Sequence, residues 1–352
     1  MKTIEEIDKN FRANTDITGR SVKFYSAEEK PLKIHGVFRE KDRFCRMPKS
    51  VGETVSEGVS RQTCNTAGGR IRFRTDSPYV VLHAVMGSYR RMPHFAFCGS
   101  CGFDIYDESG EKNTFMGSFQ PPMENQDEFG SIVEFTSSKM RDIIINMPTY
   151  SDVKAVYIGL DNDSVILTPK PYKFETPIVY YGSSITHGAC ASRPGNTYEQ
   201  IISRRLGCDY INLGFSGHAR GEKTMAEYIA GLNMSVFVYD YDHNAPTAEE
   251  LKKTHKPMFD IIRKENPDLP IVMLSRPNFS KTDELSERIE IIRDTYETAI
   301  REGDKNVYFI SGQDMANYAD PDIITVDGIH PNDFGFWCMA EVIGKVIEKL
   351  LK

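Results

Sequence analysis

The chain of 352 residues has no long hydrophobic run and no block of like charge. Its first residues, "MKTIEEIDKNFRANTD", lack the apolar stretch of a secretory signal, and no segment approaches the length of a transmembrane helix. Basic and acidic residues nearly balance, at 43 against 50. We therefore expect a cytoplasmic protein whose partners include neither nucleic acid nor membrane.

Cysteine is also scarce. The seven cysteines are an odd number and are widely spread, which suits a reducing compartment. Cys98 and Cys101 form a C-x-x-C pair, but no second pair and no histidines at ligand spacing accompany it, so we expect buried thiols and no metal site.

The texture of the sequence changes near residue 168. Between about residues 21 and 168, short β-prone runs alternate with turn residues, which predicts a β-sandwich or jelly roll. The next segment, "TPKPYKFETP", carries three prolines and reads as a stiff linker. We predict a sandwich domain over residues 1–168 that is a candidate for substrate binding, a linker over 169–177 and a catalytic domain over 178–352.

After the linker, strand-like runs alternate with helical segments. The runs lie at residues 178–181, 209–213, 235–240, 270–274 and 306–310. Alternating strands and helices predict a parallel sheet with helices on both faces. In such a sheet, ligand sites lie at the carboxyl ends of the strands.

Two serines stand at the end of the first of these strands, in "IVYYGSSITHG". A serine there needs a base to become a nucleophile, and the G-x-S-x-G elbow that would mark one fold of serine hydrolase is absent. Near the other end of the chain, "DGIHPN" places Asp327 three residues before His330. A carboxylate held against Nδ1 would leave Nε2 of the imidazole to accept the serine proton. The alternative is a surface loop in which His330 caps the following helix.

Two other segments are candidates for an oxyanion hole. In "INLGFSGHA", glycines follow the second strand and allow backbone N–H groups to turn toward a ligand. Asn244 follows the third strand and carries a side-chain N–H. The alternatives are an ordinary glycine-rich turn and an ordinary turn asparagine.

In order and placement, these four segments resemble the conserved blocks of the SGNH (GDSL-like) esterase superfamily, over about residues 178 to 352. The resemblance implies a flavodoxin-like three-layer α/β/α domain. It makes Ser184 the nucleophile, with Asp327 and His330 completing the triad, and it assigns the oxyanion hole to Ser184, Gly217 and Asn244. The sequence departs from the family pattern at two points: Ser183 replaces the usual Asp of the first block, and the third block has no glycine.

The segments "GGRIRFRTDSPYV" and "GFDIYDESG" resemble the β-sandwich that precedes SGNH domains in two-domain bacterial esterases with a G-x-D-L-Y motif. Relatives of this layout are carbohydrate acetylesterases of gut bacteria that act on acetylated mannans and other hemicelluloses. The resemblance implies a serine esterase that removes O-acetyl groups from mannan or xylan oligosaccharides through an acyl-enzyme, without metal or organic cofactor. The alternatives are an esterase for another small polar ester, a lipid or a thioester, and a non-catalytic carbohydrate-binding protein.

The candidates for substrate contact are polar or aromatic residues that could bind sugar. They are His187, His243, Arg276, Tyr89 and Trp337. Each could equally be an ordinary core or surface residue. Because the linker is short and stiff, we expect a fixed contact between the domains, with the loop "MGSYRRMPHF" at the mouth of the Ser184 site. The sequence makes no prediction of the oligomeric state.

Overall fold

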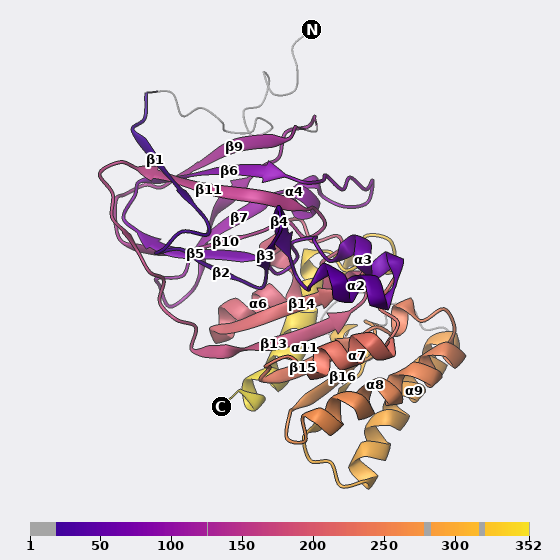
Figure 1. Cartoon of the computed structure of the whole chain (residues 1–352). Helices are drawn as coiled ribbons and strands as arrows, with labels where there is room; N and C mark the ends of the chain where they lie inside the picture. Colours follow the sequence, from indigo (N-terminus) through magenta and orange to yellow (C-terminus); the bar gives the residue numbers. More distant parts are fainter. Residues whose placement is uncertain (1–18, 125, 278–282, 317–320, 352) are drawn as a thin grey trace.

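The computed structural model describes residues 19–124, 126–277, 283–316 and 321–351. It shows an antiparallel β-sandwich followed by a parallel α/β domain, and the two pack against each other along one side (Figure 1). Both fold classes agree with the sequence predictions.

Two antiparallel sheets form the sandwich. The first contains β1 (Val22–Ser26), β11 (Val153–Asp161), β6 (Tyr79–Met86) and β9 (Glu128–Glu134), in that order. The second contains β12 (Ile166–Leu167), β5 (Arg70–Thr75), β10 (Arg141–Asn146), β7 (Phe103–Asp107) and β8 (Thr114–Phe119), with β2 (Lys33–His35) also paired to β5. Apolar side chains such as Phe73, Leu82 and Ile145 are fully buried between the sheets, as the alternation within the strands requires.

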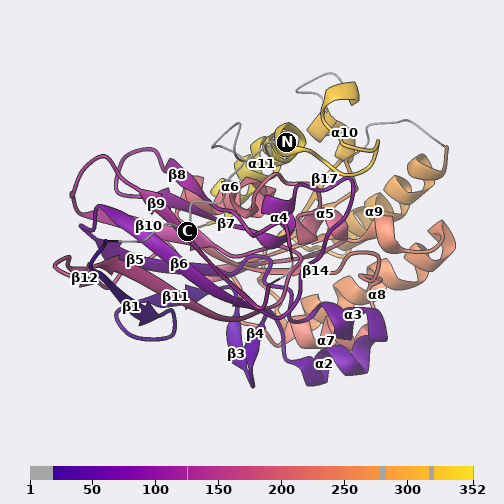
Figure 2. The same ribbon diagram turned by 90° about the horizontal axis from the view of Figure 1, so that it is seen from above.

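The amino-terminal domain also contains helices that the sequence patterns did not predict. After the hairpin of β3 (Phe38–Glu40) and β4 (Arg43–Cys45), the chain forms α2 (Lys49–Val55) and α3 (Glu57–Gln62), and α4 (Phe97–Cys101) follows β6. α2 and α3 leave the sandwich and lie beside α7 (Lys223–Ala230) of the other domain (Figures 1 and 2). Met47 and Val59 are buried in the same apolar cluster as Phe215 of the α/β domain. These helices therefore share a hydrophobic core with that domain.

Five parallel strands form the second sheet. Their order is β14 (Cys208–Gly214), β13 (Phe174–Gly182), β15 (Val236–Asp240), β16 (Ile271–Leu274) and β17 (Val307–Ile310). This is the flavodoxin-like order, in which the first strand lies at the point where the winding reverses. β13 begins at Phe174, so the last four residues of the predicted linker belong to a strand.

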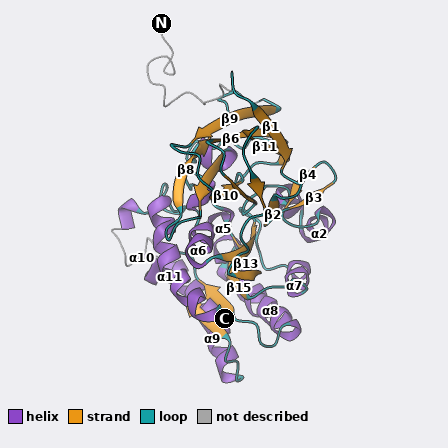
Figure 3. Ribbon diagram, turned by 90° about the vertical axis from the view of Figure 1, so that its left-hand side faces the viewer, coloured by secondary structure: helices purple, strands orange, loops and turns teal. Residues whose placement is uncertain are grey.

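Helices cover both faces of the parallel sheet. α6 (Tyr198–Leu206) and α11 (Asp333–Leu350) lie on one face, and α7 (Lys223–Ala230), α8 (Ala248–Glu265) and α9 (Asp283–Arg301) on the other. Figure 3 shows β13 and β15 between α6 and α11 on one side and α7 and α8 on the other. Ile178 and Tyr180 of β13 face the first layer, whereas Val179 and Tyr181 face the second. The shorter elements are α5 (Ser184–His187), α10 (Gly312–Ala316) and single 3-10 turns at Pro194–Asn196, Asp242–Asn244 and Pro321–Ile323.

Within the described ranges, no helix combines the length and the apolar character needed to cross a bilayer. Cys45 and Cys64 form a disulfide across the segment that holds α2 and α3. The other cysteines, Cys98, Cys101, Cys190, Cys208 and Cys338, are free thiols. Because disulfides persist mainly in oxidising compartments, this pair is at odds with the reducing compartment that the cysteine pattern suggested, and the location itself stays a prediction.

A buried arginine joins the two domains. Arg46 of the sandwich domain is 2% exposed and donates to the carbonyl oxygens of Asn212 at 3.2 Å and Gly214 at 2.8 Å. Its guanidinium also lies 4.9 Å from the centre of the Phe215 ring. Burial lowers the pKa of Arg46 to about 9, so the group remains charged at neutral pH. The expected fixed contact between the domains is confirmed.

A second arginine repeats this arrangement at the start of β14. Arg70, with no exposed surface, donates to the carbonyl oxygen of Tyr210 at 2.7 Å and to the carboxylate of Asp209 at 2.8 Å. Its guanidinium stacks 3.9 Å from the centre of the Tyr210 ring. Both ends of β14 are thus tied to the sandwich domain.

Replacing Arg46 by Ala should lower the free energy of unfolding by roughly 2–4 kcal/mol, because buried carbonyl oxygens would lose their donor at about 1–3 kcal/mol each. Urea denaturation of the full chain measures this. Arg61→Ala is the matched control, because the Arg61 side chain is 66% exposed and pairs only with Glu57 in the same helix among the ion pairs of the described residues. That control should change stability by no more than about 0.5 kcal/mol. Equal effects of the two substitutions would contradict a stabilising role for Arg46.

Candidate active site

The two serines at the end of β13 occupy different environments. Ser183 is fully buried, and its hydroxyl accepts a hydrogen bond from the N–H of Ile185 at 3.2 Å, which caps α5. Ser184 is the first residue of α5 and is only partly buried. Of the two, Ser184 is the one whose hydroxyl is available for chemistry.

The loop before α11 holds a carboxylate in one orientation. Gly328 adopts a positive φ of 81°, which closes a tight turn in which the N–H of Val326 donates to the carbonyl of His330 at 2.9 Å. Oδ1 of Asp327 accepts from the N–H groups of Ile329 at 3.0 Å and His330 at 2.8 Å. The second carboxylate oxygen is left to face the imidazole.

A chain of hydrogen bonds connects this loop to the serine. Nδ1 of His330 lies 2.8 Å from Oδ2 of Asp327, and Nε2 lies 2.9 Å from Oγ of Ser184. Burial raises the pKa of the Asp327 carboxyl, but hydrogen bonds from the backbone and imidazole of His330 outweigh it and hold the pKa at about 2. The carboxylate is therefore ionised near neutral pH and fixes the tautomer in which Nε2 accepts a proton.

The following helix has its own cap. The side chain of Asn332 accepts from the N–H groups of Phe334 at 3.1 Å and Gly335 at 3.0 Å. His330 therefore does not cap α11, and the alternative reading of the D-x-x-H segment as a capping loop is not supported.

The three predicted oxyanion donors follow the carboxyl ends of the neighbouring strands β13, β14 and β15. The N–H of Ser184 begins α5 and has no carbonyl one turn earlier to receive it within the helix. Gly217 is exposed at a positive φ of 73°, and a side chain there would meet open space. Nδ2 of Asn244 donates to the carbonyl of Phe215 at 3.0 Å, which leaves its second N–H for another acceptor. Their roles as oxyanion donors stay predictions.

Two of the predicted substrate contacts, His243 and Arg276, lie against each other. Nη1 of Arg276 is 3.1 Å from Nδ1 of His243, and both side chains are partly buried at the ends of β15 and β16. Burial, followed by the charge of Arg276, lowers the pKa of His243 to about 3. His243 therefore presents a neutral imidazole near the catalytic loop.

The other three candidates lie elsewhere. His187 has no exposed surface and stacks on Tyr150 at 4.0 Å between ring centroids, so its position does not support a substrate contact. The ring of Tyr89 packs beside that of Phe97 within the sandwich domain, with 6.2 Å between the ring centroids. Trp337 is 37% exposed and lines a groove of about 630 Å³ between the domains.

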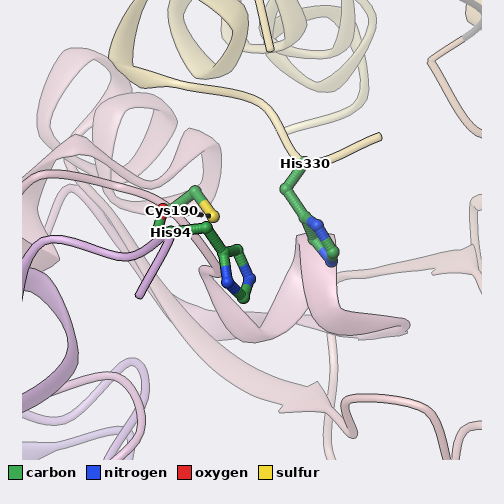
Figure 4. Close-up of side chains that lie close together, drawn as sticks. All are labelled: His94, Cys190 and His330. Carbon is green, nitrogen blue, oxygen red and sulfur yellow. Dashed lines mark hydrogen bonds between the residues drawn. The ribbon is translucent and has the colours of Figure 1, made fainter. Parts of the chain in front are cut away.

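The sandwich domain brings a further histidine to the site. His94 lies in the loop between β6 and α4, and its ring centroid is 5.7 Å from that of His330 (Figure 4). Phe95, next to it, is buried against the ring of Tyr150 at 5.3 Å. This confirms that the loop "MGSYRRMPHF" reaches the site. His94 was not predicted as a site residue, because its closeness to His330 arises only from the packing of the two domains. Its position within the loop "MGSYRRMPHF", which was expected at the site, is the one sequence signal that could have identified it.

The geometry agrees with comparisons to known families. Residues 175–348 match the GDSL-like lipase/acylhydrolase family, and residues 22–166 match the GxDLY family, described as the N-terminus of SGNH-hydrolase-type esterases. The carboxy-terminal domain belongs to the GDSL-like family. The amino-terminal match is to a domain that precedes SGNH-hydrolase-type esterases, and the GDSL-like match follows it in the chain. The chain is therefore an SGNH-type esterase. No curated protein matches the chain significantly.

Solved structures share both domains of this esterase. A protein from Bacteroides ovatus ATCC 8483 described as a GDSL-like lipase is 28% identical, with a TM-score of 0.84 over 94% of this chain and 98% of its own. The salicylyl-acyltransferase SsfX3 of a tetracycline biosynthetic pathway is 18% identical, with a TM-score of 0.76 over 94% and 97%. A family two carbohydrate esterase from Clostridium thermocellum is 16% identical, with a TM-score of 0.61 over 90% and 98%. The latter two likenesses show that the whole two-domain fold recurs.

Ser184→Ala should lower kcat for p-nitrophenyl acetate by about 10⁴–10⁶, because the attacking atom is removed. Ser183→Ala is the matched control: it loses the cap of α5, worth about 1 kcal/mol, but keeps the nucleophile and should retain a substantial fraction of the activity. Steady-state rates and melting curves of both variants test this. Activity of Ser184→Ala comparable to that of the unmodified protein would rule out the serine mechanism.

Asp327→Asn should keep the fold and lower kcat by about 10⁴. The amide oxygen can still accept the two backbone N–H bonds, but the amide nitrogen would donate to Nδ1 of His330 and favour the wrong tautomer. Because the Asp327 pKa is about 2, the unmodified enzyme should not lose activity through this carboxyl anywhere near neutral pH. Circular dichroism and pH–rate profiles provide the measurement. A variant with full activity and a normal melting temperature would show that Asp327 does not orient His330.

Proposed function

We propose that this esterase removes O-acetyl groups from acetylated mannan or xylan oligosaccharides through an acyl-enzyme. The observation that carries the proposal is the continuous hydrogen-bonded chain from Asp327 through His330 to Ser184, at 2.8 and 2.9 Å. It lies at the carboxyl end of β13, where the sheet order reverses and where open α/β sheets bind their ligands.

The proposed reaction begins when Nε2 of His330 takes the proton of Ser184 as its Oγ attacks the ester carbonyl. Backbone N–H groups of Ser184 and Gly217 and the side chain of Asn244 would stabilise the tetrahedral oxyanion, each donor contributing about 3–4 kcal/mol. His330 then returns the proton to the leaving sugar hydroxyl. Water, activated by the same imidazole, hydrolyses the acetyl-enzyme and regenerates the serine.

The groove that Trp337 lines supports a sugar substrate. It contains the aromatic rings of Tyr106, Phe115 and Trp337. Arginine and asparagine side chains accompany them, and mixed aromatic and polar linings of this kind suit flat ligands with many hydroxyls. Two of its lining residues, Arg193 and Asp333, lie close in the chain to Cys190 and His330 at the catalytic centre. An oligosaccharide in the groove would thus extend from the acetylated residue at Ser184.

The structural relatives also favour a carbohydrate substrate. Besides the enzyme from Clostridium thermocellum, which was solved with cellohexaose, the acetyl xylan esterase Est2A from Butyrivibrio proteoclasticus shares the fold, at 12% identity and a TM-score of 0.59. The imidazole of His94 lies 5.7 Å from that of His330 between ring centroids, which places a second polar side chain beside the candidate base. Both points favour a small acyl group on a polar alcohol.

We expect acetate release from acetylated mannan and xylan oligosaccharides, and a fall in kcat/KM from p-nitrophenyl acetate to longer acyl chains. Trp337→Ala should raise KM for the oligosaccharides while leaving p-nitrophenyl acetate hydrolysis unchanged, because only the larger substrate fills the groove. Phe38→Ala, which removes a 40% exposed ring on β3 outside the groove, is the matched control.

Acetate chromatography and mass spectrometry of the trapped acyl-enzyme distinguish the alternatives. A preference for long-chain esters would indicate a lipase. Transfer of the acyl group to an added alcohol without acetate release would indicate an acyltransferase. Binding of oligosaccharides with no turnover of any ester would leave a carbohydrate-binding protein.

A further inference from the structure

Three side chains with metal-binding atoms converge at the mouth of the Ser184 site. They are His94 of the sandwich domain, Cys190 in the loop after α5, and His330 (Figure 4). One donor atom from each, two imidazole nitrogens and a thiol sulfur, lies within 4.8 Å of the other two. The sequence did not predict this group, because its members are 96 and 140 residues apart along the chain (190 − 94 and 330 − 190).

The interface between the domains holds two members of the group in place. Sγ of Cys190 donates a hydrogen bond to the backbone carbonyl of His94 at 3.4 Å. Phe95, Tyr150 and Cys190 belong to one buried apolar cluster, which anchors the loop next to His94. The imidazole of His94 itself is exposed, so it can rotate and is open to ions from solvent.

The third member is already oriented for a metal. Nδ1 of His330 is engaged by the carboxylate of Asp327 at 2.8 Å, so a metal would bind Nε2 in place of its hydrogen bond with Oγ of Ser184. A carboxylate behind a histidine in this way is the usual support of a metal-bound imidazole, because it fixes the tautomer and raises the basicity of the other nitrogen.

We propose that His94, Cys190 and His330 form an inhibitory binding site for Zn²⁺. One thiolate and two imidazoles are a donor set that suits this borderline-soft ion. In a tetrahedral site with Zn–N bonds of about 2.0 Å and a Zn–S bond of about 2.3 Å, the donor atoms stand roughly 3.3–3.6 Å apart. Donor atoms that lie as far apart as 4.8 Å must approach by roughly 1 Å, and rotation of the exposed His94 ring can bring its nitrogen closer to the other two. Binding releases the thiol proton of Cys190 to solvent and changes no other covalent bond.

Occupation of this site removes the general base. Nε2 of His330 has a single lone pair, and it is the atom that lies 2.9 Å from Oγ of Ser184. A metal bound there excludes proton transfer from the serine. With three protein donors the fourth position stays open, as in exchangeable sites rather than closed structural ones. The inhibition rests on the proposed role of His330, whereas the binding itself does not.

The first measurement is a titration of the chelator-treated full chain with Co²⁺, which replaces Zn²⁺ and gives a thiolate charge-transfer absorption when cysteine is a ligand. We expect this absorption with one ion per chain. Cys190→Ser should abolish it, and both Cys190→Ser and His94→Asn should weaken binding by at least about tenfold, in line with the loss of metal-site interactions elsewhere. Cys98→Ser and His83→Asn are the matched controls, because these two residues lie outside the group and should change nothing.

The second measurement is the inhibition of p-nitrophenyl acetate hydrolysis by Zn²⁺, with each variant compared with its own metal-free rate. The concentration for half inhibition should rise at least about tenfold in Cys190→Ser and His94→Asn and stay constant in the controls.

Absence of the thiolate absorption in the folded, unmodified chain would overturn the site. Equal zinc sensitivity of all variants would overturn it as well. Cobalt binding through Cys190 in a protein that hydrolyses no ester would support the site and contradict the proposed function, so the two failures are distinguishable.

Discussion

The active site depends on one constraint: side chains of the sandwich domain, Arg46 above all, hold the loop after β14 in place. Arg46 is 2% exposed, and its guanidinium donates to the carbonyl oxygens of Asn212 and Gly214, where the strand ends and the candidate oxyanion loop begins. Gln62 adds a hydrogen bond to the carbonyl of Ser216 at 3.0 Å. The N–H groups of Phe215, Ser216 and His218 in this loop donate to other protein acceptors, whereas the hydrogen bonds of the described residues include no acceptor for the N–H of Gly217, the predicted oxyanion donor. The sandwich therefore acts as a structural part of the catalytic centre.

The same interface explains why a histidine adjacent to the nucleophile serves packing. His187 ends α5, three residues after Ser184, and is stacked on Tyr150 of the sandwich with Nδ1 3.4 Å from the N–H of Ser216. Burial, followed by the charge of Arg46, lowers its pKa well below the ordinary value, so the ring is neutral. A neutral, stacked imidazole connects the turn that holds Ser184 to the candidate oxyanion loop, and it leaves His330 as the candidate general base.

Local sequence signals predicted the parts that depend on neighbouring residues. At the start of α8 the side chain of Thr247 accepts from the N–H of Glu250 at 3.1 Å, a cap that residues three apart in the chain can form. Asp327 and His330 were predicted as a pair because three residues of chain can close a hydrogen bond. The signals failed where the partner was distant: α2 and α3 are short, weakly patterned helices whose apolar residues find their core in the other domain, and the last part of the proline-rich linker became the start of β13.

The sequence by itself determined the alternation of strands and helices after residue 178, the serine-bearing segment at the end of a buried strand, and the Asp–His pair. Each of these features follows from hydrophobic periodicity or from contacts between residues a few positions apart. Such local interactions do not depend on the rest of the fold. The family resemblance had already assigned Ser184 as the nucleophile, and the structure shows its Oγ facing the imidazole of His330. Only the tertiary structure decided that His187 is buried. It also decided that His94 meets Cys190 and His330. These outcomes depend on how two domains dock, and docking is set by the burial of matched apolar and hydrogen-bonding surfaces from positions far apart in the chain.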